Sequence, residues 1–338
     1  MSQKTVPLAV AGIAGVLLSS LAMSQPVHAE GKIRIAEQFG ITYLLLHVAR
    51  EQALIEKHGA ERGVDIEVEW LQLSGGAAVN DALLSGAIDI AGAGVGPLLT
   101  IWDRTHGNQG VKGVASLGEF PNFLITNNPE VRHLEDFGPN DRIAVPAVGV
   151  SIQSRFLQKA VADIHGVEAF DQLEGNTVAL PHPDATAALI SGGTEITAHF
   201  SAIPFQYQAL EHDGIHTVID SYEILGGPVS PTVLYATESY RNDNPETYAA
   251  FLDALAEAQA YIESDPAGAA DIYRDVTGTQ LEQAFLESLI TDEQVSFSLV
   301  PRNTYPIAEF LHAVGAIRNE PVSWQDYFFD DVHGWEGS

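Results

Sequence analysis

The sequence predicts a two-lobed α/β fold, and three observations support this prediction. Short β-branched runs alternate with patterns of helical spacing along the whole chain after residue 30. The alternation occurs as two consecutive blocks of similar design, which predicts two sheets with helices around each. The chain has 338 residues, whereas a single hydrophobic core stops growing near about 250–300 residues. Length and pattern therefore agree on two packed lobes.

The first 29 residues have the pattern of an export signal. Lys4 supplies a short positive region, an apolar run follows from Val6 to Met23, and Val27-His28-Ala29 places small residues at the −3 and −1 positions of a cleavage site. The apolar run contains two serines and is short for a membrane span. We therefore expect a signal peptide over residues 1–29, cleavage before Glu30, and a mature protein free in the periplasm.

Composition narrows the classes of partner and chemistry. The chain contains no cysteine, which excludes a lipid-modified N-terminal Cys, a disulfide, a thiolate metal site and a Cys nucleophile. Its formal net charge is −29, and loss of Lys4 with the signal peptide takes this to −30. Such a surface repels nucleic acid and anionic lipid. We expect no nucleic-acid partner and a monomer, and the acidity itself is consistent with a saline habitat that screens self-repulsion.

The first block predicts a strand-and-helix series that begins directly after the signal peptide. Each strand ends in a short loop that leads into a helix, as glycine and proline positions indicate. The expected strands are 32–37, 64–71, 88–91 and 113–117, and the expected helices are 41–58, 77–85 and a segment from the 92–97 loop to about residue 104.

The second block repeats this design and is followed by a largely helical region. Expected strands are 142–145, 177–180, 195–200 and 216–219, with helices at 152–165, 185–191 and from about 205 to 212. A strand at 232–236 would return the chain to the first lobe, before helices at 245–264, 267–276, 279–289 and 304–314.

Two crossings are expected between the lobes, near 117–122 and 226–232. They divide the mature chain into a discontinuous first lobe, 30–118 with 229–338, and a second lobe, 119–228. In such sheets ligands bind beyond the carboxyl ends of the strands, where loops lead into helix N-termini. Two crossings form a hinge over the cleft between the lobes.

Three motifs in register carry a resemblance to a known family. They are residues 74–94 (SGGAAVNDALLSGAIDIAGAG), residues 184–193 (DATAALISGG) with a helix-opening Pro204 behind them, and Tyr235-Ala236-Thr237 followed by Tyr240-Arg241 and Asn244-Pro245. The order resembles that of the substrate-binding proteins of nitrate/sulfonate/taurine-type ABC importers. The likeness covers essentially all of the mature chain.

The resemblance implies a type II periplasmic-binding fold whose cleft closes over one small-molecule ligand. It also implies delivery of that ligand to an ABC permease in the inner membrane, driven by a cytoplasmic ATPase. The pyrimidine-precursor binders of thiamine uptake are a related alternative, and a periplasmic adaptor that presents ligand to a sensor is another. The cysteine-bearing motif of the pyrimidine-synthesising relatives is absent from this cysteine-free chain.

Loops at predicted strand ends supply the candidate ligand contacts. Glycine lets backbone N–H groups approach a ligand, and a helix N-terminus favours an acceptor or anion; each of these loops could instead be a structural turn or cap. The candidates are Gln38, Phe39 and Gly40; Ser74 and Gly75; Gly94, Val95 and Gly96; Gly149, Val150 and Ser151; His182; and Ser201, Ile203 and Phe205.

Glu119 and Phe120 are added because they lie at the first crossing, where a carboxylate could recognise an amine. Arg155, one turn into its helix, is the nearest basic residue to these loops. The scarcity of Lys and Arg leaves room for a neutral, aromatic or amine-bearing ligand, although backbone amides and hydroxyls alone can hold an oxyanion.

No motif indicates enzyme chemistry. The sequence contains no Gly-x-Ser-x-Gly elbow, no HExxH, no Walker loop and no GxGxxG, and its 12 histidines are scattered. We therefore expect no catalytic residue, no cofactor and no metal site. A secreted hydrolase with residues assembled from distant segments is the remaining rival class, and turnover of a bound solute would identify it.

Overall fold

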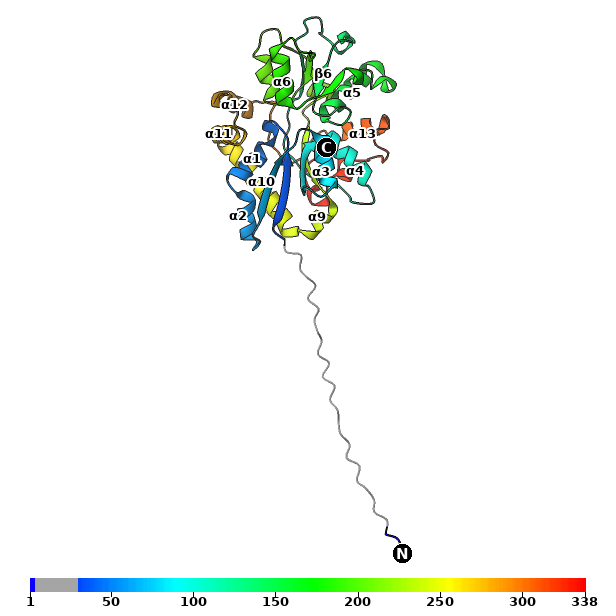
Figure 1. Ribbon diagram of the computed structural model, residues 1–338, viewed down its shortest axis with the longest axis vertical. Coiled ribbons are helices and arrows are strands. Elements are labelled where there is room, and N and C mark those ends of the chain that lie inside the picture. Colours follow the sequence, from blue (N-terminus) through cyan, green and yellow to red (C-terminus); the bar gives the residue numbers. More distant parts are fainter. Residues whose placement is uncertain (4–29) are drawn as a thin grey trace.

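The computed structural model describes residues 1–3 and 30–338 and has two lobes, each built on one five-stranded sheet. Figure 1 shows the lobes stacked one above the other, with the second lobe (green) on top and both early and late segments of the chain in the lower, first lobe. The predicted signal peptide, apart from its first three residues, lies outside the described residues.

The first sheet has the strand order β2-β1-β3-β10-β4. Strands β1, β2 and β3 are parallel, and β10 runs antiparallel to both β3 and β4. The predicted return of the chain at residues 232–236 is thus confirmed. The bounds are β1 Lys32–Glu37, β2 Glu67–Gln72, β3 Ile90–Gly94, β4 Lys112–Ser116 and β10 Thr232–Ala236.

The second sheet repeats this layout in the order β7-β6-β8-β5-β9. Its β5 takes the place that β10 has in the first sheet and runs antiparallel to β8 and β9. β5 directly follows the first crossing and was not predicted from the sequence. The bounds are β5 Phe123–Thr126, β6 Ile143–Val145, β7 Thr177–Ala179, β8 Ala198–Phe200 and β9 His216–Asp220.

Helices cover both sheets, and their buried faces follow the apolar spacing of the sequence. In α1, for example, Leu44, Leu45 and Val48 are fully buried. The first lobe holds α1 Leu44–Glu51, α2 Leu54–Glu61, α3 Gly76–Leu84, α4 Val95–Thr105, α9 Glu238–Asp243, α10 Pro245–Ser264, α11 Pro266–Thr277, α12 Gln283–Ile290 and α13 Tyr305–Ala313. The second holds α5 Ile152–His165, α6 His182–Ser191, α7 Phe205–Leu210 and α8 Ser221–Leu225.

Short 3-10 turns lie between these elements: η1 Ile41–Tyr43, η2 Leu134–Asp136, η3 Val167–Ala169, η4 Glu174–Asn176, η5 Trp324–Tyr327 and η6 Asp330–Val332. The single helix predicted over residues 41–58 was wrong. It is divided into η1, α1 and α2, because Ala53 adopts a left-handed conformation with φ 48°, which ends one helix and starts the next.

The two crossings run side by side and are bonded to each other. The Phe120 N–H donates to the Val229 carbonyl at 3.2 Å, and the Leu117 N–H donates to the Thr232 carbonyl at 3.1 Å. The Glu119 N–H donates to the Ser296 carbonyl at 2.7 Å, which ties the first crossing to the segment after α12. The two crossings therefore form one hydrogen-bonded strap between the lobes.

The segment after α13 packs across the first lobe, an arrangement that was not predicted from the sequence. The buried Asp103 carboxylate of α4 accepts hydrogen bonds from the Arg318 and Asn319 N–H groups, both at 2.8 Å. The Trp102 indole donates to the Asp326 carbonyl at 3.1 Å. In the part of the chain that the structure describes, none of the helices combines the length and apolar character that a bilayer crossing requires.

Candidate ligand-binding cavity between the lobes

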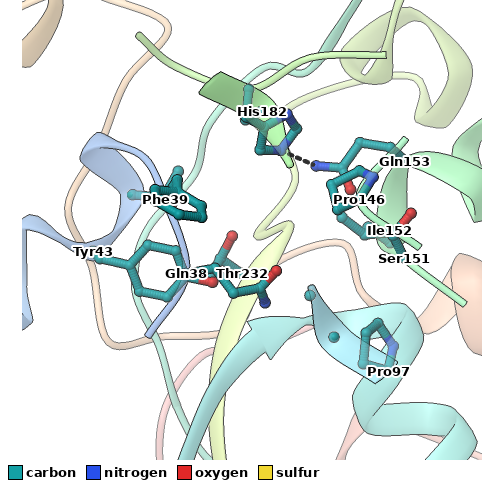
Figure 2. A pocket seen from close by; sticks show the side chains of 14 residues that line it. Gln38, Phe39, Tyr43, Pro97, Pro146, Ser151, Ile152, Gln153, His182 and Thr232 are labelled. Carbon is teal, nitrogen blue, oxygen red and sulfur yellow. Dashed lines mark hydrogen bonds between the residues drawn. The ribbon is translucent and has the colours of Figure 1, made fainter. Parts of the chain in front are cut away.

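A small cavity of about 30 Å³ lies where the loops of the two sheets meet. Figure 2 shows the rings of Phe39 and His182 and the amides of Gln38 and Gln153 around one common space. Residues of both lobes line it: Gln38, Phe39, Thr42, Tyr43, Gly76, Gly94, Pro97 and Thr232 from the first, and Pro146, Ser151, Ile152, Gln153, His182 and Ala202 from the second. We call this space the interlobe cavity.

None of the described residues that line the interlobe cavity is a Lys, Arg, Asp or Glu. Its polar groups are amides, hydroxyls, an imidazole and backbone atoms. A hydrogen bond from its amide to the Gly92 carbonyl, at 3.3 Å, orients the Gln38 side chain. The Tyr43 hydroxyl donates to the same carbonyl, also at 3.3 Å. A solute held here is recognised by hydrogen bonds and dipoles, not by a formal opposite charge.

Four helices begin at the cavity wall. Gly76 is the first residue of α3, Gly94 precedes α4, Ser151 precedes α5, and His182 is the first residue of α6. The Ser151 hydroxyl accepts a hydrogen bond from the Ser154 N–H at 3.3 Å and so caps α5. The N-terminal end of a helix carries partial positive charge and free N–H groups. Together these ends favour an anion or an acceptor-rich solute without any basic side chain.

His182 lies at the start of α6, and not in the loop before a helix at 185–191 as predicted from the sequence. Its ring stacks on Phe205, with centroids 5.7 Å apart and planes at 18°. Burial lowers the pKa of His182 to about 3, and it lowers that of His199 well below the ordinary value, with His182 as the second cause. Both rings are therefore neutral at pH 7.

A buried chain of polar contacts fixes the orientation of the His182 ring. Gln153 Nε2 lies 3.4 Å from His182 Nε2, His182 Nδ1 lies 2.9 Å from His199 Nε2, and His199 Nδ1 lies 3.4 Å from Thr186 Oγ1. With the amide nitrogen of Gln153 facing His182, each neutral ring accepts from one neighbour and donates to the next. The chain runs from the cavity into the second lobe and leaves the Gln153 amide oxygen for other donors.

Three of the glycines predicted to contact ligand lie where the two lobes touch each other. A Cβ placed on Gly94 would lie 2.8 Å from the Ile152 Cβ, and one on Gly75 would lie 2.6 Å from the Pro146 carbonyl oxygen. A Cβ on Gly96 would lie 2.8 Å from the Val150 carbonyl oxygen. Because a side chain at these positions meets the opposite lobe, the glycines allow the lobes to contact each other.

Five of the residues predicted for the site line the interlobe cavity: Gln38, Phe39, Gly94, Ser151 and His182. A second group lies at the contact between the lobes, where the Ile41 N–H donates to the Ile203 carbonyl at 3.0 Å. This group consists of Gly40, Gly75, Gly96, Val150 and Ile203.

The other predicted residues lie apart from the interlobe cavity. Val95 is fully buried and its N–H donates to the Pro231 carbonyl at 3.0 Å. Ser201 is fully buried, and its N–H donates to the Phe123 carbonyl at 2.8 Å. Ser74 is exposed, Gly149 lines a separate small cavity beside Glu174, and Phe205 reaches the site only through its stacking on His182.

Glu119, Phe120 and Arg155 have structural partners. The Glu119 carboxylate lies 3.4 Å from the Arg302 guanidinium, and Phe120 packs edge-on against Phe297 with centroids 5.3 Å apart. Arg155 is 7% exposed and donates to the Gln158 amide oxygen at 2.9 Å. Burial lowers the pKa of Arg155 to about 10, with Glu174 opposing this shift.

Nine lining residues were missed: Thr42, Tyr43, Gly76, Pro97, Pro146, Ile152, Gln153, Ala202 and Thr232. Four of them, Gly76, Pro97, Ile152 and Ala202, are immediate neighbours of predicted residues, and another four lie two or three residues away, so a wider window around each strand end would have found these eight. Thr232 had a separate signal in the sequence, since it is the first residue of the strand predicted over residues 232–236. In the structure it pairs with Gly94. Within the described residues no group of three or more His, Cys, Asp or Glu side chains is placed to hold a metal ion.

Solved structures place this two-lobed arrangement among periplasmic binding proteins. The chain superposes on the alkanesulfonate-binding protein SsuA of Xanthomonas axonopodis pv. citri, bound to MOPS, with a TM-score of 0.66 and 16% identity over 86% of this chain and 95% of that one. For SsuA of Escherichia coli the values are 0.62 and 16% over 90% and 99%. For the nitrate-binding protein NrtA of Synechocystis PCC 6803 they are 0.59 and 14% over 77% and 69%.

These likenesses establish the type II periplasmic-binding fold. The model of the NMT1-like family matches residues 37–275, which is more than half of the chain. The protein therefore belongs to the NMT1-like family. A comparison with curated protein sequences finds no significant match.

Proposed function

We propose that the protein is the solute-binding component of an ABC-type importer. In this role it captures a small molecule between its lobes and delivers it to a permease in the inner membrane that is coupled to a cytoplasmic ATPase. The observation that carries the proposal is the interlobe cavity, an uncharged space lined by both lobes and bordered by four helix N-termini. Among the described residues that line it, no hydroxyl is hydrogen-bonded to an imidazole or a carboxylate, and binding without turnover is the activity we propose.

The solute class we propose is a small sulfonate- or nitrate-like oxyanion, or a small organic molecule rich in acceptors. Helix N-termini stabilise negative charge through the N–H groups of their first turns. The hydroxyls of Ser151 from the second lobe and Thr232 from the first lobe add donors to the same cavity. The similar structures named for alkanesulfonate and nitrate support this class.

A planar neutral heterocycle such as a pyrimidine is the second candidate. Phe39 and His182 present their rings to the same uncharged space, and aromatic walls with a few hydrogen-bonding groups suit a flat heteroaromatic ring. The cavity of about 30 Å³ is small for such a ring, so this candidate requires the lobes to lie further apart than they do here.

Capture is proposed to work by closure of the two lobes, 30–118 with 229–338 and 119–228. Only the closed state offers a solute the contacts of both lobes, so binding shifts the population towards that state. The strap at Glu119–Ser296 and Phe120–Val229 is the proposed hinge. Small-angle scattering tests this directly, because a saturated protein whose radius of gyration equals that of the free monomer would exclude closure.

Export to the periplasm is proposed on the basis of the signal-peptide pattern in residues 1–29. The expected mature N-terminus has a structural role, since the Glu30 carboxylate accepts hydrogen bonds from the Glu246 and Thr247 N–H groups at the start of α10, both at 2.9 Å. Mass spectrometry of protein recovered from the periplasm should give a chain that begins at Glu30. A chain that retains Lys4 would contradict cleavage.

A ligand screen by thermal shift tests the function itself, because a ligand that binds only the folded protein raises its apparent stability. The panel holds alkanesulfonates, taurine, nitrate, pyrimidines and amino acids, each at several concentrations. We expect a saturable rise with one class and an unchanged solute after incubation. Conversion of the solute would identify an enzyme instead.

A further inference from the structure

A larger space borders the interlobe cavity at Gln38 and Phe39. It measures about 380 Å³, and its wall includes Glu37, His47, Trp70, Phe205 and Tyr273 together with Phe39. We call it the chamber. It shares Gln38 and Phe39 with the interlobe cavity, but residues of α1 and α11 line the chamber and not the interlobe cavity. In volume it can accept a drug-sized fragment, which the interlobe cavity in this arrangement cannot.

Two ionisable side chains in the chamber wall are buried without satisfied hydrogen bonds. Glu37 and His47 are 4% and 1% exposed, and Glu37 Oε2 lies 3.2 Å from His47 Nε2. Within the described residues neither that oxygen nor either ring nitrogen of His47 has a partner with hydrogen-bond geometry. Buried polar groups in folded proteins are nearly always paired. The Glu37 carboxylate and the His47 ring therefore leave unused hydrogen-bonding capacity in the wall of the chamber.

The rest of the chamber suits a flat group. The rings of Phe39, Trp70, Phe205 and Tyr273 line it, and the Tyr273 ring centre lies 5.6 Å from that of His47. Aromatic faces attract cations as well as apolar surface. Arg50, the other charged group in the wall, is exposed and stands 6.0 Å from the Trp70 ring centre. It lies at the solvent end of the chamber, whereas Glu37 lies at the buried end.

We propose that the chamber is a second ligand site, separate from the interlobe cavity, which takes a flat cationic nitrogen group, an amidinium or a protonated aromatic amine, against Glu37 and His47. The cation supplies the N–H donors that the Glu37 carboxylate lacks, and the aromatic walls cover its faces. Because Pro204 and Phe205 of the second lobe also line the chamber, an occupant contacts both lobes. The site does not depend on which solute binds in the interlobe cavity.

Benzamidine is the probe, and Trp70 is the reporter, since it lines the chamber but not the interlobe cavity. We expect a saturable change in tryptophan fluorescence with benzamidine, a weaker one with neutral benzyl alcohol and none with benzoate. Trp70→Phe should remove the optical change while calorimetry still detects binding. These results are independent of the solute screen, so either proposal can fail while the other stands.

Glu37→Gln keeps the size of the side chain and removes its charge. It should weaken benzamidine about ten- to hundredfold, the range for one charge-assisted hydrogen bond. The matched control is Glu69→Gln, which should leave the affinity unchanged. Glu69 lies on the neighbouring strand β2, its side chain is 44% exposed, and it pairs with Lys32 at 2.6 Å. Val276→Trp adds bulk to the chamber from its half-buried rim and leaves Glu37 and His47 unsubstituted, so it should abolish benzamidine binding and tests the site if Glu37→Gln fails to fold.

Three results would overturn the proposal. One is the absence of a saturable signal at millimolar benzamidine in the folded protein, and another is binding of benzoate as tight as that of benzamidine. The third is an equal loss of affinity in Glu37→Gln and Glu69→Gln, which would show only the attraction of an acidic protein for cations.

Discussion

Gly94 lies directly against Ile152 of the opposite lobe, so closely that a Cβ at residue 94 would stand 2.8 Å from the Ile152 Cβ. Real Cβ atoms do not approach so closely, and neither atom belongs to the end of a flexible side chain. The contact joins the start of α4 to the start of α5, next to the interlobe cavity. The separation of the lobes is therefore set in part by the absence of a side chain at this position.

Gly94→Ala should hold the lobes apart and weaken solute binding. Overpacking at a close contact costs about 1–3 kcal/mol, which corresponds to roughly five- to 150-fold in affinity. Scattering in the presence of the solute found by the screen should give a larger radius of gyration for the variant than for the parent. Gly175→Ala is the control, because nothing lies within 4 Å of its Cβ; an equal effect of both substitutions would contradict the prediction.

The sequence indicated which loops meet but not what each glycine does there. Glycines at strand ends predicted backbone close to a ligand, and Gly94 does line the interlobe cavity. Gly75 and Gly96 instead meet backbone of the other lobe. A glycine that lines the cavity and a glycine that contacts the other lobe look the same in the sequence, since both positions need a residue without a Cβ. Only the relative position of the lobes separates them, and that position depends on contacts between residues far apart in the chain.

Gln153→Met removes the amide that faces the interlobe cavity while it keeps the length of the side chain. Loss of one hydrogen bond should weaken solute binding by about 1 kcal/mol, or about fivefold. Calorimetric titration of the parent and the variant measures this difference. Gln172→Met, at an exposed position in the same lobe, is the control and should bind as the parent does. Unchanged affinity in Gln153→Met would remove Gln153 from the site.

The buried histidines should make folding stability fall as the pH drops. Burial lowers the pKa of His182 to about 3 from 6.5, so the unfolded chain takes up a proton between these values that the folded protein refuses. Stability is therefore unaffected above pH 6.5 and decreases below it, by at most about 1.4 kcal/mol per pH unit for each such residue. His199 acts in the same direction.

His182→Gln and His199→Gln should each flatten this pH dependence, and the double variant should flatten it further. Urea unfolding at several pH values between 7 and 4 measures the slope, which stays informative even if a variant is less stable at every pH. Curves that run parallel to that of the parent protein would show that the two rings do not remain neutral in the folded state.

Fold class could be predicted because it follows from periodicity, whereas three other features could not. β5 has only four residues, too few for a clear alternating pattern, and it follows the crossing directly after Pro121-Asn122. The left-handed conformation of Ala53 could not be predicted, because residues that favour this conformation, glycine and asparagine, are absent from that position. The Glu37–His47 pair joins the end of a strand to the middle of a helix, and its spacing matches no motif. Each depends on tertiary packing that overrides or bypasses local preference.

Asp103 should anchor the C-terminal segment in a way that acid can undo. Burial raises the pKa of its carboxyl, but the Asn319 and Arg318 N–H groups and the Asn319 side chain outweigh burial and lower it below 3.8. The stabilisation is therefore complete above pH 3.8 and is lost as the pH falls through the lower folded value.

Asp103→Asn replaces the carboxylate by an amide, which accepts the hydrogen bonds of Arg318 and Asn319 less well. It should lower the free energy of unfolding by about 1–3 kcal/mol at pH 7, with a smaller difference from the parent near pH 3. Urea unfolding of both proteins at the two pH values measures this, with the exposed Asp275→Asn as control. An equal loss at both pH values would show that the segment is held by packing of Trp102 against it, and not by the carboxylate.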